Sequence, residues 1–191
     1  EHGWSFGIFS PENQPIEYHM QKLAEKYIGK PMERGPTERM TEADLDMATT
    51  WIDSHYVFML PDRPLIDTIL DAAGQLVKRR GIRGLVIDPW NEVEHHKERD
   101  TSETEYISLA LSKVRKFARL HDVHVWVVAH PTKLQKDLDK KYPVPTPYDV
   151  AGSAHWRNKA DNCIAVWRDP VASTGEVEVH VQKVRKKIVG R

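Results

Sequence analysis

The sequence predicts an α/β fold built on a mostly parallel sheet. Through the first two thirds of the chain, short apolar runs of strand length alternate with segments whose apolar residues recur at helical spacing. This alternation is typical of a parallel sheet covered by helices on both faces, with right-handed crossovers. The last third has two strand-like runs with little helix between them, which indicates an antiparallel edge. Because 191 residues are too few for two comfortable domains, we expect one domain over residues 1–191.

The strands are predicted from apolar runs that stop at proline or at polar residues. The run Val123–Ala129 is the clearest candidate for a buried strand, whereas the last run alternates valine with polar residues, as a half-exposed strand does. The predicted strands are Ser5–Ser10, Tyr56–Leu60, Leu85–Ile87, Val123–Ala129, Cys163–Trp167 and Val177–Val184.

The helices are predicted from apolar spacing and from residues that begin or end a helix. Thr41 is expected to cap one helix start, and the stretch Thr101–Glu105 another. Gly29 and Gly81 stand where helices should end. The predicted helical stretches are Ile16–Tyr27, Leu45–Ile52, Leu65–Val77 and Ile107–Leu120.

Composition limits the possible functions. Lys and Arg total 28 and Asp and Glu total 28, so the chain has no overall basic field, and any polyanion site must be a local patch. Cys163 is the only cysteine, which excludes a disulfide within the chain and favours a reducing compartment. No run is long and apolar enough to predict a membrane span, and no leader is evident. We therefore expect a cytoplasmic protein.

Three predicted strands are followed by polar groups: Glu12, Asp88 and His130. If the strands are parallel neighbours, these groups gather along one edge of the sheet, where ligands of α/β proteins bind. Two acids and a hydrogen-bonding group there suit triphosphate hydrolysis, which depends on positioning and charge neutralisation. Taken singly, each has an ordinary explanation: Glu12 can begin a helix, Asp88 can cap a turn, and His130 can be a turn residue.

The ordered series of motifs resembles the RecA-type motor domain of hexameric replicative helicases. Within that group it is most similar to the Twinkle type and its phage and bacterial relatives, with DnaB more distant. The matching segments are Ser10–Asn13, Leu85–Asp88, Val127–His130, Asp149–Ser153 through Asp161, and Gln182–Arg185. The resemblance implies a three-layer RecA-like core, ATP or another nucleoside triphosphate as substrate with Mg²⁺, and a homo-oligomeric ring, hexameric in this family, on single-stranded DNA. It also implies a bacterial or phage-infected cell as the place of action.

The resemblance implies a role for each matching residue. Glu12 would orient the attacking water, Asp88 would hold magnesium through water, and His130 would contact the γ-phosphate. In this family Lys183 and Arg185 would reach the nucleotide of the neighbouring subunit, Arg185 as an arginine finger. Other positions match the nucleotide base contact, Arg168, and the DNA-facing loop: Lys133, Gly152, Ser153 and Arg157.

One family motif is absent, because no Gly-x-x-x-x-Gly-Lys-Ser/Thr occurs in the sequence. In the family this phosphate loop precedes the strand before Glu12, and its own strand lies beside the strand Val123–Ala129. We therefore expect that the chain is a fragment beginning after the phosphate loop and inactive by itself, because that loop supplies the amides that bind phosphate.

Two other classes of function compete with a helicase motor. One is a metal-dependent phosphoesterase or nuclease, whose candidate ligands are Asp88, Glu94, His95, His96 and His130. The other is a non-catalytic module that retains only DNA or subunit contacts. Whichever class holds, the basic residues Lys183, Arg185, Lys186 and Lys187 also have an ordinary explanation, as charges that guard an edge strand against aggregation.

Overall fold

The computed structural model describes residues 3–95, 102–136, 142–150, 154–169 and 175–186. The chain divides into two compact units, each considered below by itself. The first contains residues 1–94 and 117–128, and the second contains residues 95–116 and 129–191.

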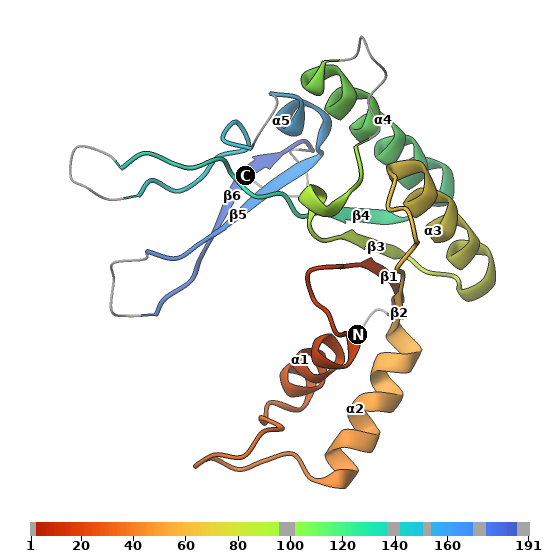
Figure 1. The fold of residues 1–191 in the computed structure, drawn as a ribbon, viewed down its shortest axis with the longest axis vertical. Coiled ribbons are helices and arrows are strands. Elements are labelled where there is room, and N and C mark those ends of the chain that lie inside the picture. Colours follow the sequence, from red (N-terminus) through yellow and green to blue (C-terminus); the bar gives the residue numbers. More distant parts are fainter. Residues whose placement is uncertain (1–2, 96–101, 137–141, 151–153, 170–174, 187–191) are drawn as a thin grey trace. The chain divides into compact units, whose positions relative to one another are not determined.

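The first unit is built on a parallel sheet of four strands (Figure 1). Its strands are β1 (Phe6–Phe9), β2 (Tyr56–Phe58), β3 (Gly84–Ile87) and β4 (His124–Val127), in the spatial order β2-β1-β3-β4. All three strand pairs are parallel, as the sequence predicted. Because neighbouring strands point the same way, the carboxyl ends of all four lie along one edge of the sheet.

Helices connect these strands, and their ends follow the predicted signals. Thr41 and Asp44 form a capping box at the start of α2, with Thr41 Oγ1 accepting from the Asp44 amide at 3.1 Å. Gly29 and Gly81 end α1 and α3 with φ of 77° and 64°, a left-handed conformation that favours glycine. The helices are α1 (Ile16–Ile28), α2 (Glu42–His55), α3 (Ile66–Arg80), the 3₁₀ helix η1 (Trp90–Glu92), α4 (Glu103–His121) and α5 (His155–Lys159).

The main core of the first unit lies between the sheet and α3. The side chains of Phe9, Leu85 and Ile87 on this face are at most 1% exposed. A Cβ atom added at Gly7 would lie 3.3 Å from Leu76 of α3, which places the helix directly against the sheet. A smaller core forms where α1 and α2 pack together beside β2, around Ala24, Ala48 and Ile52.

The prediction of a buried strand over Val123–Ala129 is wrong in its extent and in its burial, although Val123 itself is buried. The structure has a shorter strand, β4, at the end of the sheet, and its residues alternate between exposed and half-buried. Trp126 and Val128 are 39% and 40% exposed. Among the described strands β4 pairs with β3 alone, which puts it at the end of the described sheet.

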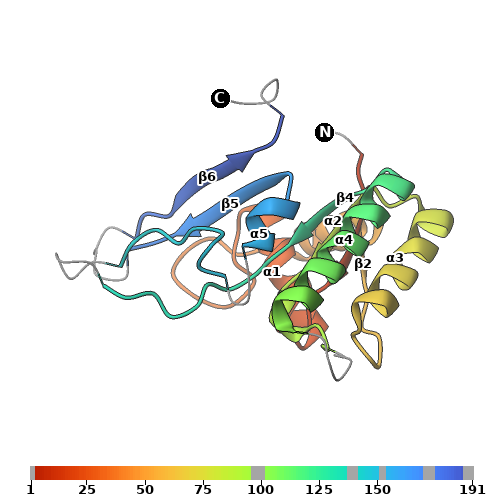
Figure 2. The same cartoon turned by 90° about the horizontal axis from the view of Figure 1, so that it is seen from above.

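The second unit contains the antiparallel strands β5 (Asn162–Trp167) and β6 (Glu178–Val184) and the short helix α5 (Figure 2). The predicted antiparallel pair is present, hydrogen-bonded as a separate two-stranded sheet. A register shift between Cys163 and Ile164 marks a bulge. One set of its facing side chains is aliphatic and more than 60% exposed: Ile164, Val166, Val179 and Val181.

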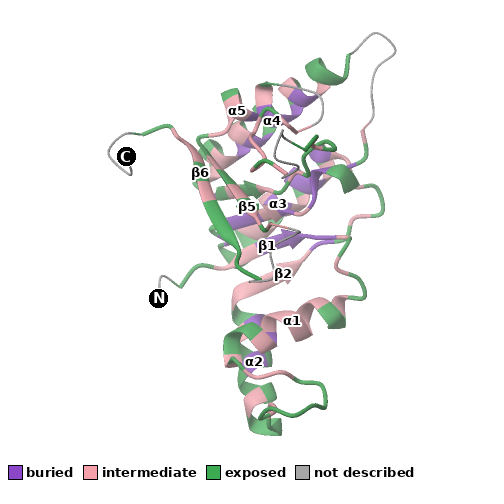
Figure 3. Cartoon of the chain, turned by 90° about the vertical axis from the view of Figure 1, so that its left-hand side faces the viewer, coloured by how far each residue is buried: buried purple, intermediate pink, exposed green. Residues whose placement is uncertain are grey.

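Burial differs between the strands of the two sheets (Figure 3). The central strands β1 and β3 are mostly buried, whereas every residue of β5 and β6 is exposed or intermediate. Among the helices that the structure describes, none is long and apolar enough to cross a membrane.

Candidate active site

The first unit brings two of the predicted acids to the same edge of the sheet. Glu12 lies in the turn after β1, and Asp88 directly follows β3. These two strands pair in register from Phe6 and Gly84 to Phe9 and Ile87, and the Asp88 amide donates to the Phe9 carbonyl at 2.8 Å. Glu12 is exposed and Asp88 half-buried, so both carboxylates belong to the accessible edge of the sheet.

A buried serine connects the two motif segments. Ser10, only 4% exposed, donates its hydroxyl to Asp88 Oδ2 at 3.2 Å across 78 residues of sequence. Asn13 Nδ2 donates to the same hydroxyl oxygen at 2.8 Å, and Lys22 Nζ donates to Asn13 Oδ1 at 3.3 Å. Because the Asn13 amide occupies a lone pair of the Ser10 oxygen, the hydroxyl proton is left to point at Asp88. This chain of hydrogen bonds from Lys22 through Asn13 and Ser10 therefore orients one carboxylate oxygen of Asp88.

His19 of α1 is close enough to sense the charge of Asp88. Burial lowers the pKa of His19, and the nearby Asp88 carboxylate only partly offsets this. The ring packs edge-on against Phe58 with centroids 5.1 Å apart. His19 is therefore favoured as a neutral packing residue beside the acidic edge.

His130 follows β4 along the chain and belongs to the second unit. It is exposed. Its predicted meeting with Glu12 and Asp88 stays a prediction.

The loop predicted to face DNA is closed at its base by a small set of hydrogen bonds. Pro131 and Val150 form an isolated antiparallel bridge, and Thr132 donates its amide and hydroxyl to the Asp149 carbonyl at 2.7 and 2.9 Å. Lys133 is exposed and comes directly after this closure. The other two predicted loop residues, Gly152 and Ser153, lie outside the described residues.

The predicted basic pair meets the end of α5 in the second unit. Lys183 and Arg185 are two positions apart at the end of β6, so they lie on one face of the strand. Lys183 Nζ donates to the carbonyls of Arg157 and Ala160, the latter at 2.8 Å. Arg185 binds Asp161 through Nε at 2.8 Å and donates Nη2 to the Asn158 carbonyl at 3.0 Å.

Burial affects two side chains that face each other in this sheet. The pKa of Lys183 is lowered first by burial and then by the positive charge of Arg185. Cys163, its partner in the register, has a raised pKa because burial disfavours the thiolate. The sole cysteine is therefore a half-buried packing thiol.

The remaining predicted site cations are Arg157, expected to face DNA, and Arg168, expected to contact the nucleotide base. Arg157 is on α5, with its guanidinium 5.5 Å from the centre of the Tyr148 ring, a cation–π geometry. Arg168 is exposed and directly follows β5.

The alternative metal site receives no support from the part of the chain that the structure describes. Glu94 forms a two-point ion pair with Arg63, with N–O distances of 3.0 and 3.3 Å. The His95 ring packs 4.9 Å from that of Tyr106, and His96 lies outside the described residues. No group of three or more His, Cys, Asp or Glu side chains within those described could hold a metal ion.

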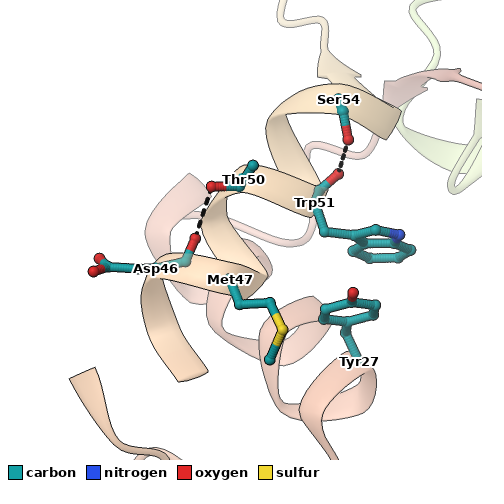
Figure 4. Close-up of a pocket in the computed structure, with 6 residues that line it drawn as sticks. All are labelled: Tyr27, Asp46, Met47, Thr50, Trp51 and Ser54. Carbon is teal, nitrogen blue, oxygen red and sulfur yellow. Dashed lines mark hydrogen bonds between the residues drawn. The ribbon is translucent and has the colours of Figure 1, made fainter. Parts of the chain in front are cut away.

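A separate surface pocket lies between α1 and α2 (Figure 4). The rings of Tyr27 and Trp51 stack in parallel with centroids 4.3 Å apart, and Met47 lies beside them. Asp46, Thr50 and Ser54 complete the lining. None of the predicted site residues is in this pocket.

Two residues that shape the site lie in the matching segments, but the sequence predicted no role for them. Ser10 is an unremarkable serine before a proline, and only the pairing of β1 with β3 reveals its bond to Asp88. Asp161 precedes β5, and only the antiparallel register brings it to Arg185. The one local signal for each residue is its position, a polar side chain at the boundary of an apolar run.

Comparisons with known proteins agree with this geometry. The chain is 40% identical over 199 aligned residues to the Twinkle homolog protein, chloroplastic/mitochondrial, of Arabidopsis thaliana, covering 99% of the chain. A structure described as a DnaB-like replicative helicase and its interactions with primase matches with a TM-score of 0.75 and 21% identity over 95% of the chain. The chain spans 28% of the length of the Arabidopsis protein and 47% of that structure's chain. No protein-family model matches the chain.

These matches confirm the predicted resemblance and the fold class. The similarity to the Twinkle homolog extends over nearly the whole chain, and the parallel sheet with its small antiparallel partner is the α/β fold of the DnaB-like structure.

Proposed function

We propose that this chain forms the larger part of the motor domain of a nucleoside-triphosphate-driven DNA helicase that assembles as a ring on single-stranded DNA. The observation that carries the proposal is the meeting of two motif segments at one edge of a parallel sheet. Glu12 and Asp88 follow adjacent strands, and Ser10 bonds directly to Asp88. The 40% identity to a Twinkle homolog supports the same function.

The residues at this edge fit a magnesium ion that arrives with a nucleotide. Mg²⁺ prefers oxygen ligands, keeps several waters, and in triphosphate sites uses one or two carboxylates with the phosphates. Asp88 offers a half-buried carboxylate whose Oδ2 is held by Ser10. Such an ion would neutralise phosphate charge during hydrolysis.

Each remaining role rests on the position of the side chain. Glu12 is exposed and follows β1, the strand that pairs with the strand before Asp88. It would accept a hydrogen bond from the attacking water and orient it. His130, in the segment that follows β4, would donate to a γ-phosphate oxygen. Lys183 and Arg185 would act on the nucleotide of a neighbouring subunit, where a guanidinium offsets charge that develops in the transition state.

We propose further that residues 1–191 are one part of a longer motor domain. Three features support this: the absence of a phosphate loop from residues 1–191, the place of β4 at the end of the described sheet, and the exposed aliphatic face of β5 and β6. A strand beside β4 would satisfy its outer backbone groups, and further chain over the valines would remove them from water. The fragment alone should bind nucleotide poorly.

The DNA partner is proposed from local cations. Lys133 is exposed beside the closed base of its loop, and Arg157 lies on α5 in the same unit. With a net charge of zero, such a patch and not an overall field would have to attract the DNA backbone. The cytoplasmic location stays a prediction from the sequence, and the Arabidopsis relative is a chloroplastic/mitochondrial protein by name.

The decisive experiment measures hydrolysis in the full-length protein with DNA present. Glu12→Gln should lower kcat by about 100-fold or more, because a positioned base contributes that much. Nucleotide affinity should change by less than about two-fold, since the amide preserves shape and removes only basicity. Glu17→Gln, at an exposed acid in the first turn of α1, is the matched control and should keep the wild-type rate.

Two outcomes contradict the proposal. If the full-length wild type binds DNA yet hydrolyses no triphosphate, the chain belongs to a non-catalytic module. If Glu12→Gln hydrolyses at the wild-type rate, the acid after β1 does not orient the attacking water.

A further inference from the structure

One carboxylate in the second unit collects two guanidinium groups. Asp161 Oδ1 accepts from Arg185 Nε at 2.8 Å and from Arg115 Nη2 at 3.4 Å. The two arginines come from the end of β6 and from α4, so Asp161 joins segments that lie 46 residues before it and 24 residues after it. Its own side chain is 56% exposed, against 34% for Arg185.

Arg185 is restrained at its backbone as well as at its tip. Its amide donates to the Asp161 carbonyl at 2.9 Å, which continues the β5–β6 pairing by one step. At the tip, Nη2 donates to the carbonyls of Asn158 and Ala160 at 3.0 and 3.4 Å. The bonds to described residues engage Nε and Nη2, and Nη1 takes no part in them. The guanidinium plane is therefore held along one side while Nη1 keeps its donors for another acceptor.

Lys183 is held by the same turn of chain. The Ala160 carbonyl accepts from both Lys183 Nζ and Arg185 Nη2, and the Arg157 carbonyl accepts from Lys183 as well. These carbonyls belong to the last turn of α5 and the residue that ends it, where carbonyl oxygens lack partners within the helix. Of the two cations, Arg185 alone has a carboxylate partner there.

We propose that Asp161 is a positioning residue for Arg185, and this inference rests on the proposed role of Arg185 as a finger toward a neighbouring subunit's nucleotide. A long arginine side chain samples many rotamers, and a finger acts well only if its charge already faces the position where transition-state charge develops. Asp161 fixes Nε, and the α5 carbonyls fix Nη2, so that Nη1 projects in one direction. Asp161 touches no substrate itself.

The test uses the full-length protein and separates kcat from KM. Asp161→Ala should lower kcat about ten-fold or more with KM within about two-fold, because the finger contributes in the transition state and little to ground-state binding. Asp161→Asn keeps the Oδ1 acceptor for Nε and should recover a substantial part of kcat. A purely structural defect would instead lower the fraction of protein that is competent to bind, which titration of the DNA-binding and nucleotide-binding sites measures, and kcat per competent site would then equal that of the wild type. Glu178→Ala is the matched control, since it removes an exposed carboxylate that is hydrogen-bonded to His180 Nε2 at 2.7 Å in the same sheet.

A double-variant comparison decides between coupling and independence. If Asp161 acts only through Arg185, the variant Asp161→Ala/Arg185→Ala should have the kcat of Arg185→Ala alone. Multiplicative losses, or a wild-type kcat in Asp161→Ala, would overturn the positioning role while leaving the helicase proposal intact. If Arg185→Ala itself hydrolyses at the wild-type rate, the finger assignment fails and the positioning role with it. Should Asp161→Ala not fold, the same comparison is made with Asp161→Ser, whose shorter side chain withdraws the acceptor from Arg185 Nε and whose coupling to Arg185 must carry the same sign.

Discussion

Gly84 at the start of β3 is the position where adding a single methyl group should disturb the fold most clearly. Its Cα lies opposite Phe6 in the sheet, and the Phe6 ring covers the space that a side chain would occupy. A Cβ atom at Gly84 would lie 2.2 Å from Phe6 Cδ1 and 3.1 Å from Trp126 Cζ3. The ring cannot retreat freely, because it packs against Tyr56 and Trp126 with centroid separations of 5.7 and 5.8 Å.

The magnitude follows from two opposing effects. Carbon atoms in contact are normally about 3.5–4.0 Å apart, so the ring must move by roughly 1.3 Å or more. Forcing extra volume into a packed site costs about 1–3 kcal/mol. Replacing glycine in an extended segment returns about 0.4–1 kcal/mol by restricting the unfolded chain. Gly84→Ala should therefore lower the free energy of unfolding by about 1–2 kcal/mol.

Urea denaturation followed by circular dichroism measures this difference. With a slope of about 2 kcal/mol/M, the midpoint should fall by about 0.5–1 M. Gly74→Ala is the matched control, because its Cβ would meet His121 and Phe117 at an ordinary 3.8 Å and alanine favours the interior of α3. That variant should be as stable as the wild type or more so. A Gly84→Ala protein with an unchanged midpoint would refute the packing argument.

Three further changes test other parts of the chain. Thr41→Ala removes the capping box of α2 and should cost about 1 kcal/mol of unfolding free energy in the same denaturation assay, with Thr50→Ala in the same helix as the comparison. In the wild type the pKa of His19 is lowered in the folded state, so the unfolded state binds the proton more strongly. The free energy of unfolding of the wild type should therefore fall as the pH drops below about 6.5, the usual pKa of histidine. His19→Gln should remove this part of the pH dependence. Denaturation midpoints at pH 7.5 and 5.5 measure this, and an equal fall in both proteins contradicts it. Lys133→Ala in the full-length protein should weaken single-strand binding and reduce its salt dependence; equal affinity at several salt concentrations would remove Lys133 from the DNA path.

Local signals in the sequence were sufficient for most of the elements. Apolar spacing and stop residues predicted the strands and the helices, and the cap at Thr41 and the glycines that end α1 and α3 occur as expected. These signals work because capping, left-handed glycine and apolar periodicity act within a few residues of each other. The alternation of strands and helices was also enough for a parallel sheet.

Contacts between distant segments were not predictable in the same way. The bond from Ser10 to Asp88 depends on which strands are neighbours, and the pairing of Asp161 with Arg185 depends on the register of β5 and β6. The residues close to these positions in the sequence determine neither the order of the strands in the sheet nor the register between them. The roles of Glu12, Asp88 and His130 came from a resemblance, and their adjacency could be argued only from the assumption that their strands are parallel neighbours.

The strand β4 shows where pattern and environment disagree. Its sequence, with valines on both sides of Trp126, has the apolar character of a strand covered on both faces, yet the strand stands at the end of the sheet with Trp126 and Val128 more than a third exposed. Apolar residues and open backbone groups on an edge promote association with other chains, and natural edges usually carry charges or prolines. Because β4 has neither, its composition supports a further strand beside it in the longer protein. Val128→Lys should therefore be tolerated by the 191-residue chain, where that side chain is 40% exposed, and should destabilise the full-length protein, where further chain would cover it; equal tolerance in both would argue that β4 is a natural edge.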